Sequence, residues 1–327
     1  MKTGRSLNDL ATEISRQAAT KKDYLAPTDK LRVREKLRLR ENEGSALLLD
    51  GLNGDAVGIT GTAHGHLASE LAIPKPYYDR CLREAPQLLA LNVNHWLHAT
   101  PRRRMVRILD GQMRAFLSDR YRPLDNMDLA ETVLPVLAQP GMKIESAELT
   151  ERRLYIKAVT TKMTAEVKKG DVVQAGIVVS NSEIGMGSVK VEPMVYRLVC
   201  TNGMIASDYS LKKYHVGRGN EADGAEEFFR DETRRADDRA FWLKVRDVVT
   251  GAFRRDVFDR IVNRLKESTG ERITGDQVKA VEIVQKKFGL NDGERSSVLS
   301  HLISGGDLSR YGLVNAVLDT NGFIPNA

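Results

Sequence analysis

The spacing of apolar residues changes several times along the first third of the chain. Residues 5–22 carry an apolar side chain at every third or fourth position, which predicts a short amphipathic helix. Residues 30–43 alternate apolar and mostly basic side chains, as in a strand with one basic face, and residues 45–52 form a shorter apolar strand. Residues 60–98 return to the helical spacing and are interrupted by prolines, so we expect several helices there.

The middle of the chain is typical of strands and the last third of helices. Residues 102–119 alternate around an Asp-Gly pair, which predicts a hairpin, and residues 124–137 form a capped helix. Residues 143–205 are rich in β-branched and aromatic residues separated by turn residues. Residues 228–268 keep helical spacing over roughly ten turns, and three shorter helical segments follow.

These patterns predict an α+β protein in which a strand-rich antiparallel core with packed helices is followed by a helical C-terminal part. We expect an N-terminal arm helix over residues 1–24 and an α+β core domain over residues 25–215. A glycine-containing stretch without apolar periodicity predicts a linker over residues 216–224. The helical C-terminal region then covers residues 225–327.

Composition adds a modest basic excess. The chain has 50 Lys and Arg against 44 Asp and Glu, a net charge of +6, which favours a polyanionic or acidic partner. Its 2 cysteines are far apart, which is typical of a reducing compartment. The amino terminus lacks the apolar core of a signal peptide and no long apolar run follows, so we expect no membrane segment and a cytoplasmic location in a bacterial host.

The predicted hairpin contains the most informative basic residues. With Asp110-Gly111 as the centre of a type I′ turn, Arg107 would lie directly opposite Arg114, with Phe116 on the same face. Two guanidinium groups that face one another cost stability unless an anion or a carboxylate lies between them. A phosphate would bind both, and Phe116 could stack on a base. The alternative is that the arginines reach solvent or acidic side chains and that Phe116 belongs to the core.

Other basic residues extend this candidate nucleic-acid surface. Arginines and an aromatic residue flank the hairpin, namely Arg102, Arg103, Arg104, Arg120, Tyr121 and Arg122. A later lysine-rich stretch adds Lys162, Lys168 and Lys169. A run of Lys212, Lys213, His215 and Arg218 is a weaker candidate, since most such runs are solvated surface.

Motifs for cofactors and catalysis are missing from the sequence. There is no Walker-type phosphate loop, no nucleophile elbow, no zinc-protease motif, and only a lone Gly-x-Gly at residues 185–187. The histidines at positions 64, 66, 95 and 98 lack companion ligands at a known spacing. We therefore expect no cofactor, no metal and a binding protein rather than an enzyme. A metal-dependent nuclease is kept as an alternative, because its carboxylates can come from distant segments.

Several stretches in a fixed order resemble the phage/plasmid-like proteins grouped as domain of unknown function 932. They are ITGTAHGHLASELAIPKPYYDRCL, LNVNHWL, RAFLSDRYRPLDN, VVQAGIVVSNSEIGMGSVKVEPMVYRLVCTNGMI and LSRYGLVNAVLD, spanning residues 55–319. The resemblance implies an origin on bacteriophages or plasmids and carries no catalytic residues. In outline the chain is also similar to phage single-strand annealing proteins, a likeness at the level of fold alone.

The sequence therefore predicts a nucleic-acid-binding protein, with ATP-independent binding and annealing of single-stranded DNA in recombination or replication as the leading function. We expect it to form a homo-oligomer. A protein-binding module of a mobile element, such as an inhibitor of a host factor or a defence protein, is the alternative from another class.

Overall fold

A computed structural model describes residues 4–36, 47–52, 56–198, 203–215 and 231–321. Its helices are α1 Leu7–Thr20, α2 Gly61–Glu70, α3 Lys75–Glu84, α4 Pro86–Ala99, α5 Asn126–Leu137, α6 Asp231–Gly251, α7 Arg255–Gly270, α8 Gln277–Phe288, α9 Asp292–Ser304 and α10 Arg310–Asn321, with short 3-10 turns η1 Thr28–Lys30 and η2 Ser207–Tyr209. Its strands are β1 Lys22–Pro27, β2 Arg32–Glu35, β3 Leu47–Asp50, β4 Val57–Ile59, β5 Arg103–Leu109, β6 Gln112–Ser118, β7 Met142–Leu149, β8 Leu154–Lys168, β9 Asp171–Asn181, β10 Val189–Arg197, β11 Gly203–Ile205 and β12 Leu211–Lys213.

The predicted α+β class is confirmed: two six-stranded sheets are packed against helices, and the C-terminal part is helical. The second half of the predicted 30–43 strand and the predicted linker 216–224 lie outside the described residues. The long helix expected over 228–268 is wrong as one element, since a turn at 252–254 separates α6 from α7. The turn lets the two helices pack against different hydrophobic clusters.

The first sheet has the order β1-β5-β6-β4-β3-β2 and is antiparallel except where β4 pairs parallel with β6. Its buried face packs against α2, α3 and α4. Helix α4 is fastened to β2 through polar contacts: the Asn94 side chain accepts from the backbone N–H of Val33 at 2.7 Å and donates to the Val33 carbonyl at 2.7 Å. The His98 ring also contacts the Leu31 carbonyl at 2.8 Å. These contacts fix the register between helix and sheet.

The second sheet is antiparallel, with the order β11-β10-β9-β8-β7 and with β12 paired to β10. Alternate residues of β8, β9 and β10 point to one face and form a core with α1, α5 and α6. Helix α7 covers the far end of this sheet, and α8, α9 and α10 form a further small cluster.

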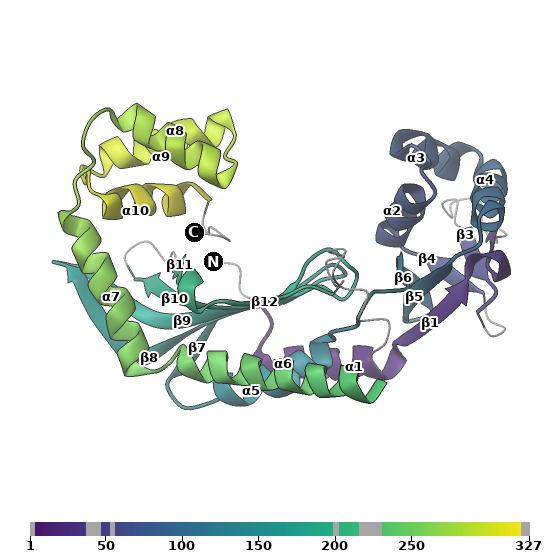
Figure 1. The fold of residues 1–327 in the computed structure, drawn as a ribbon, viewed down its shortest axis with the longest axis horizontal. Coiled ribbons are helices and arrows are strands. Elements are labelled where there is room, and N and C mark those ends of the chain that lie inside the picture. The colour runs from purple at the N-terminus through teal and green to yellow at the C-terminus, as the bar shows by residue number, and fades with distance from the viewer. Residues whose placement is uncertain (1–3, 37–46, 53–55, 199–202, 216–230, 322–327) are drawn as a thin grey trace.

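The molecule is an open arch (Figure 1). The first sheet with α2, α3 and α4 forms one arm, and α8, α9 and α10 stand at the other end. The second sheet lies between them, with α5 and α6 along its outer side. Its opposite face is therefore turned away from these helices, toward the inside of the arch.

The arm helix α1 belongs to this core, which gives a stability prediction. Ile14 is 2% exposed and packs in the cluster of α5 and α6. We expect Ile14→Ala to lower the free energy of unfolding by about 3 kcal/mol, because it removes buried methylenes and leaves a cavity. Urea denaturation measures this change. The exposed neighbour Ser15→Ala is the control and should stay within about 0.5 kcal/mol; equal effects would contradict a buried α1.

Candidate functional site

The hairpin of β5 and β6 forms as predicted, but its predicted register is wrong after the first two pairs. Asp110 and Gly111 both have positive φ, 51° and 72°, as a type I′ turn requires. Leu109 then pairs with Gln112 and Ile108 with Met113. A bulge follows, so that Arg107 pairs with Ala115 and Arg114 is the extra residue. The two arginines do not lie opposite one another.

The bulge also changes the faces. Because one extra residue inverts the alternation, Phe116 joins Val106 on the core side instead of lying beside Arg107. Phe116 is 4% exposed and cannot offer a ring to a base. The predicted cluster of two arginines and an aromatic ring on an open face is therefore wrong.

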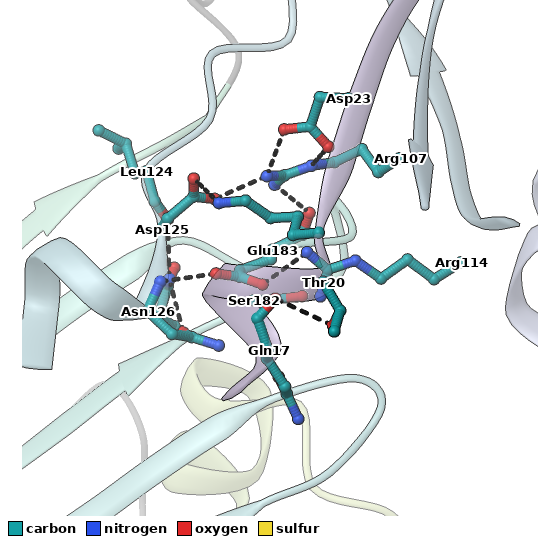
Figure 2. A network of polar contacts seen from close by, with 12 residues as sticks. Gln17, Thr20, Asp23, Arg107, Arg114, Leu124, Asp125, Asn126, Ser182 and Glu183 are labelled. Carbon is teal, nitrogen blue, oxygen red and sulfur yellow. Dashed lines mark hydrogen bonds and ion pairs between the residues drawn. The ribbon is translucent and has the colours of Figure 1, made fainter. Parts of the chain in front are cut away.

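Arg107 is enclosed by carboxylates (Figure 2). Its side chain is fully buried, and its Nη2 donates to Asp23 at 2.8 Å and to Asp125 at 2.6 Å. Nε donates to the other oxygen of Asp23 at 3.0 Å, and Nη1 donates to the Glu183 carbonyl at 2.7 Å. Lys21 is a second cation on Asp125.

Arg114 has a separate partner in the same network. Its Nη2 lies 2.7 Å from Glu183 Oε2, and both side chains are buried. The other oxygen of Glu183 accepts from the backbone N–H of Asn126, the first residue of α5, at 2.7 Å. A carboxylate at a helix N-terminus is favoured by the helix dipole. Glu183 thus joins the hairpin to α5 and to the loop after β9.

Aromatic and amide side chains complete this network, which we call the junction network. Tyr121 is buried and stacks on His215 with ring centroids 5.1 Å apart, so it is not available to stack on a base. His215 Nε2 contacts Asn181 Oδ1 at 3.0 Å, and the Asn181 amide donates to the carbonyl of Leu124. The junction network therefore joins both sheets and α5.

The titration of these groups follows from burial and neighbouring charge. Burial opposes a charge on Asp125, but Arg107 and Lys21 together hold the pKa of Asp125 below its usual range. Burial also opposes the charge on Arg107, yet the hydrogen bonds and charges of Asp23 and Asp125 raise the pKa of Arg107. Burial lowers the pKa of His215 to about 4, so its imidazole is neutral at pH 7.

The remaining predicted residues divide into paired and unpaired cations. Arg104 pairs with Glu70, Arg122 with Asp237 at 2.9 Å and Asp238 at 3.0 Å, and Lys168 with Asp307 at 2.7 Å. Among the described residues, the predicted cations that are exposed and make no ion pair are Arg102, Arg103, Arg120, Lys162 and Lys169. Arg102 and Arg103 are adjacent at the start of β5, whereas the other three come from separate segments, and the five do not line one shared cavity.

A different set of residues lies in a row across the second sheet. Tyr155 of β8 pairs with Ser180 of β9, Ser180 pairs with Lys190 of β10, and Lys190 pairs with Lys212 of β12. Neighbouring residues such as Ile156, Val179 and Val191 face the core, so this row lies on the opposite face. All four side chains line one groove of about 390 Å³, which we call the sheet groove.

The rest of the sheet groove adds charge and a tight loop. Arg153 and Tyr214 line it together with Gly185 and Gly187 of the loop between β9 and β10. Gly185 has a φ of 77°, which favours glycine at this turn. Glu192 also lines the groove, and burial raises its pKa although Lys190 and Lys212 favour its charge. The groove therefore contains one carboxylate and three cationic side chains, those of Arg153, Lys190 and Lys212.

Sequence reasoning missed most of this groove. Lys190 and Tyr155 lie in strands that mix apolar and polar residues, and only the alternation of residues 189–197 marks Lys190 as facing away from the core. Lys212 was a weak candidate from its basic run, whose Arg218 lies outside the described residues. The pairing of Lys190 with Lys212 depends on β12 returning to β10 over about 20 residues, which no local pattern reveals.

The comparison with family models matches residues 115–319 to "Domain of unknown function (DUF932)". This range covers more than half of the 327 residues and includes the network residues Tyr121, Asp125, Glu183 and His215. The chain belongs to the DUF932 family. No curated protein and no solved structure matches this DUF932 chain.

The described part of this DUF932 structure has neither a membrane-spanning helix nor a cluster of metal ligands. Of the helices in the described ranges, none combines the length and the apolar character needed to cross a membrane. In the same part of the chain, no group of three or more His, Cys, Asp and Glu side chains is placed to hold a metal ion.

The burial of Arg107 predicts the effect of removing its charge from this DUF932 protein. Arg107→Met would remove the buried cation that pairs with the carboxylates of Asp23 and Asp125. We therefore expect a loss of about 3 kcal/mol or more in the free energy of unfolding. Chemical denaturation measures the loss. Arg103→Met removes an exposed arginine of the same strand and should change stability by about 0.5 kcal/mol at most. Similar losses in both variants would refute the structural role of Arg107.

The histidines of this DUF932 fold predict its acid sensitivity. Burial lowers the pKa of His64 and of His215 from 6.5 to about 4. As pH falls from about 6.5 toward 4, these imidazoles bind protons in the unfolded state but not in the folded state. The free energy of unfolding therefore falls by about 1 kcal/mol per pH unit for each histidine. Urea denaturation between about pH 7 and pH 5 tests this. His215→Gln should have a shallower dependence, and an unchanged slope would rule out the contribution of His215.

Proposed function

We propose that this protein binds single-stranded DNA without ATP and that the sheet groove contacts the strand. The observation that carries the proposal is the direct cross-strand pairing of Lys190 with Lys212 inside that groove. Like charges directly opposite on adjacent strands are unfavourable unless an anion lies near both. Glu192 offers one carboxylate to the three cations of the groove, so a phosphodiester would supply a further anion, and backbone phosphates dominate the affinity of proteins for nucleic acid.

The neighbouring residues support a strand rather than a simple anion. Tyr155 and Tyr214 line the same groove, and Tyr214 is 46% exposed, with the Lys212 ammonium 4.6 Å from the centre of its ring. Grooves for single strands combine cations that follow the backbone with aromatic rings on which bases stack. Gly185 and Gly187 add no side chain of their own to the lining. Hence the groove offers both kinds of contact.

The hairpin arginines have no part in this proposal. Arg107 and Arg114 are held by carboxylates inside the junction network, whereas Lys190 and Lys212 make no ion pair with a carboxylate in the part of the chain that the structure describes. Proteins of mobile elements that bind single strands without ATP commonly serve recombination or replication, so we propose annealing of complementary strands as the biological step. The absence of a Walker-type motif is compatible with it.

Fluorescence anisotropy with a labelled oligothymidylate of about 30 nucleotides tests the proposal. We expect binding that weakens with salt between about 50 and 200 mM, and Lys190→Ala with Lys212→Ala should lower the slope of log affinity against log salt by about 1.4. Tyr214→Ala should weaken binding about tenfold through lost stacking.

The matched control replaces two exposed lysines of α8, Lys279→Ala with Lys286→Ala, and removes the same charge from another surface. It should leave the salt slope unchanged. No binding by the unmodified protein at low salt would end the proposal, and equal losses in the groove and control variants would reduce it to nonspecific attraction. If the unmodified protein does not bind the oligonucleotide, capture of an acidic protein partner would favour the protein-binding alternative.

A further inference from the structure

A second cavity lies among the helices and loops that pack on the first sheet and shares no lining residue with the sheet groove. It has a volume of about 540 Å³ and is enclosed by the turn between α2 and α3, by α4 and by the residues that lead into β5. Figure 1 shows these helices together in one arm of the arch. Its size suits a ligand of the dimensions of a nucleotide.

Aromatic rings are the main apolar feature of this cavity. Trp96 is 51% exposed and Tyr77 is 44% exposed, and both line it. The Tyr77 hydroxyl accepts a hydrogen bond at 3.2 Å from the Asn92 side chain, which stands one turn before Trp96 on α4. Two exposed rings at one cavity leave apolar area in water that a flat ligand would cover.

The charge of the cavity is positive. Its carboxylate, Glu70, is already paired with Arg104, whereas Arg102 is exposed and makes no ion pair in the part of the chain that the structure describes. The backbone at Arg102 is fixed by two hydrogen bonds to Thr28: its N–H donates to the Thr28 hydroxyl at 3.0 Å, and its carbonyl accepts from the Thr28 N–H at 2.8 Å. The guanidinium therefore extends from a rigid position at the rim.

The cavity wall also contains an uncommon backbone conformation. Ala72, in the turn between α2 and α3, has a φ of 51°, in the left-handed region that residues with a Cβ rarely adopt. Here it ends α2 in a Schellman motif, in which the N–H of Ile73 donates to the Ala68 carbonyl at 2.9 Å and the N–H of Ala72 donates to the Ser69 carbonyl at 3.3 Å. The motif fixes the backbone of this part of the cavity lining.

From these observations we propose that the cavity binds a nucleotide, with the base against Trp96 and Tyr77 and the phosphate on Arg102. A ring alone would satisfy the aromatic residues but leave Arg102 without an anion, and inorganic phosphate would leave both rings exposed. A nucleotide carries both features in one ligand. This proposal does not rest on the sheet groove, and it assigns a function to Arg102 that is separate from binding along that groove.

Tryptophan fluorescence tests the proposal because the sequence has 2 tryptophans. In the full-length Trp242→Phe variant, Trp96 is the single reporter, and Trp242 itself packs away from this cavity against the core of α5 and α6. We expect saturable quenching of Trp96 by deoxyadenosine monophosphate and weaker quenching by deoxyadenosine, which lacks only the phosphate. A short oligodeoxyadenylate tested alongside shows whether the nucleotide is taken free or as part of a strand.

Arg102→Ala in the Trp242→Phe background should weaken binding of deoxyadenosine monophosphate about tenfold, because a charge-assisted hydrogen bond is lost. Arg103→Ala is the matched control, since Arg103 is an exposed neighbour that does not line the cavity. Lys190→Ala with Lys212→Ala should leave the quenching unchanged, which separates this proposal from the sheet groove. Absence of quenching by both nucleotide probes, or equal affinity for deoxyadenosine and its monophosphate, would overturn it.

Discussion

The buried guanidinium of Arg107 is the interaction on which the relation between the two sheets depends. A charge with no exposure is tolerated only if carboxylates accompany it, and here they come from β1, where Asp23 lies, and from the start of α5, where Asp125 lies. The carbonyl of Glu183 adds the loop after β9. Because none of these segments can move without exposing an uncompensated charge, the first sheet, α5 and the second sheet hold fixed positions. The two cavities are therefore held at fixed positions on the same arch.

The junction network also determines where basic charge remains available. Arg107, Arg114 and Lys21 are balanced by Asp23, Asp125 and Glu183, three cations against three carboxylates, so this interior contributes little net potential at the surface. The sheet groove has three cations against Glu192, and the cavity beside α4 has Arg102 against a carboxylate already paired. A net charge of +6 is small, so the positions of the basic residues affect binding more than the total charge does.

The sequence predicted the elements well and their long-range partners poorly. Apolar spacing located α1, the hairpin turn at Asp110 and the strands of the second sheet, since each depends on local periodicity. The bulge at Arg114 was missed because it depends on how the strand packs. The structure agrees with the alternative in which the hairpin arginines pair with acidic side chains and Phe116 belongs to the core, but the sequence could not identify the carboxylates on Arg107, because they stand 84 and 18 residues away. Lys190 and Lys212 were missed as a pair because only the folded sheet brings them together.

Hydrogen–deuterium exchange with and without a saturating oligothymidylate of about 30 nucleotides tests the central claim most directly, which is that the hairpin arginines hold the fold while the second sheet contacts the strand. The account predicts added protection of the backbone in residues 185–192 and 211–214, the segments that line the sheet groove. It predicts no change in residues 103–118 of the hairpin, whose Arg107 and Arg114 are already paired with carboxylates. Protection confined to the hairpin, with the sheet groove unaffected, would contradict it.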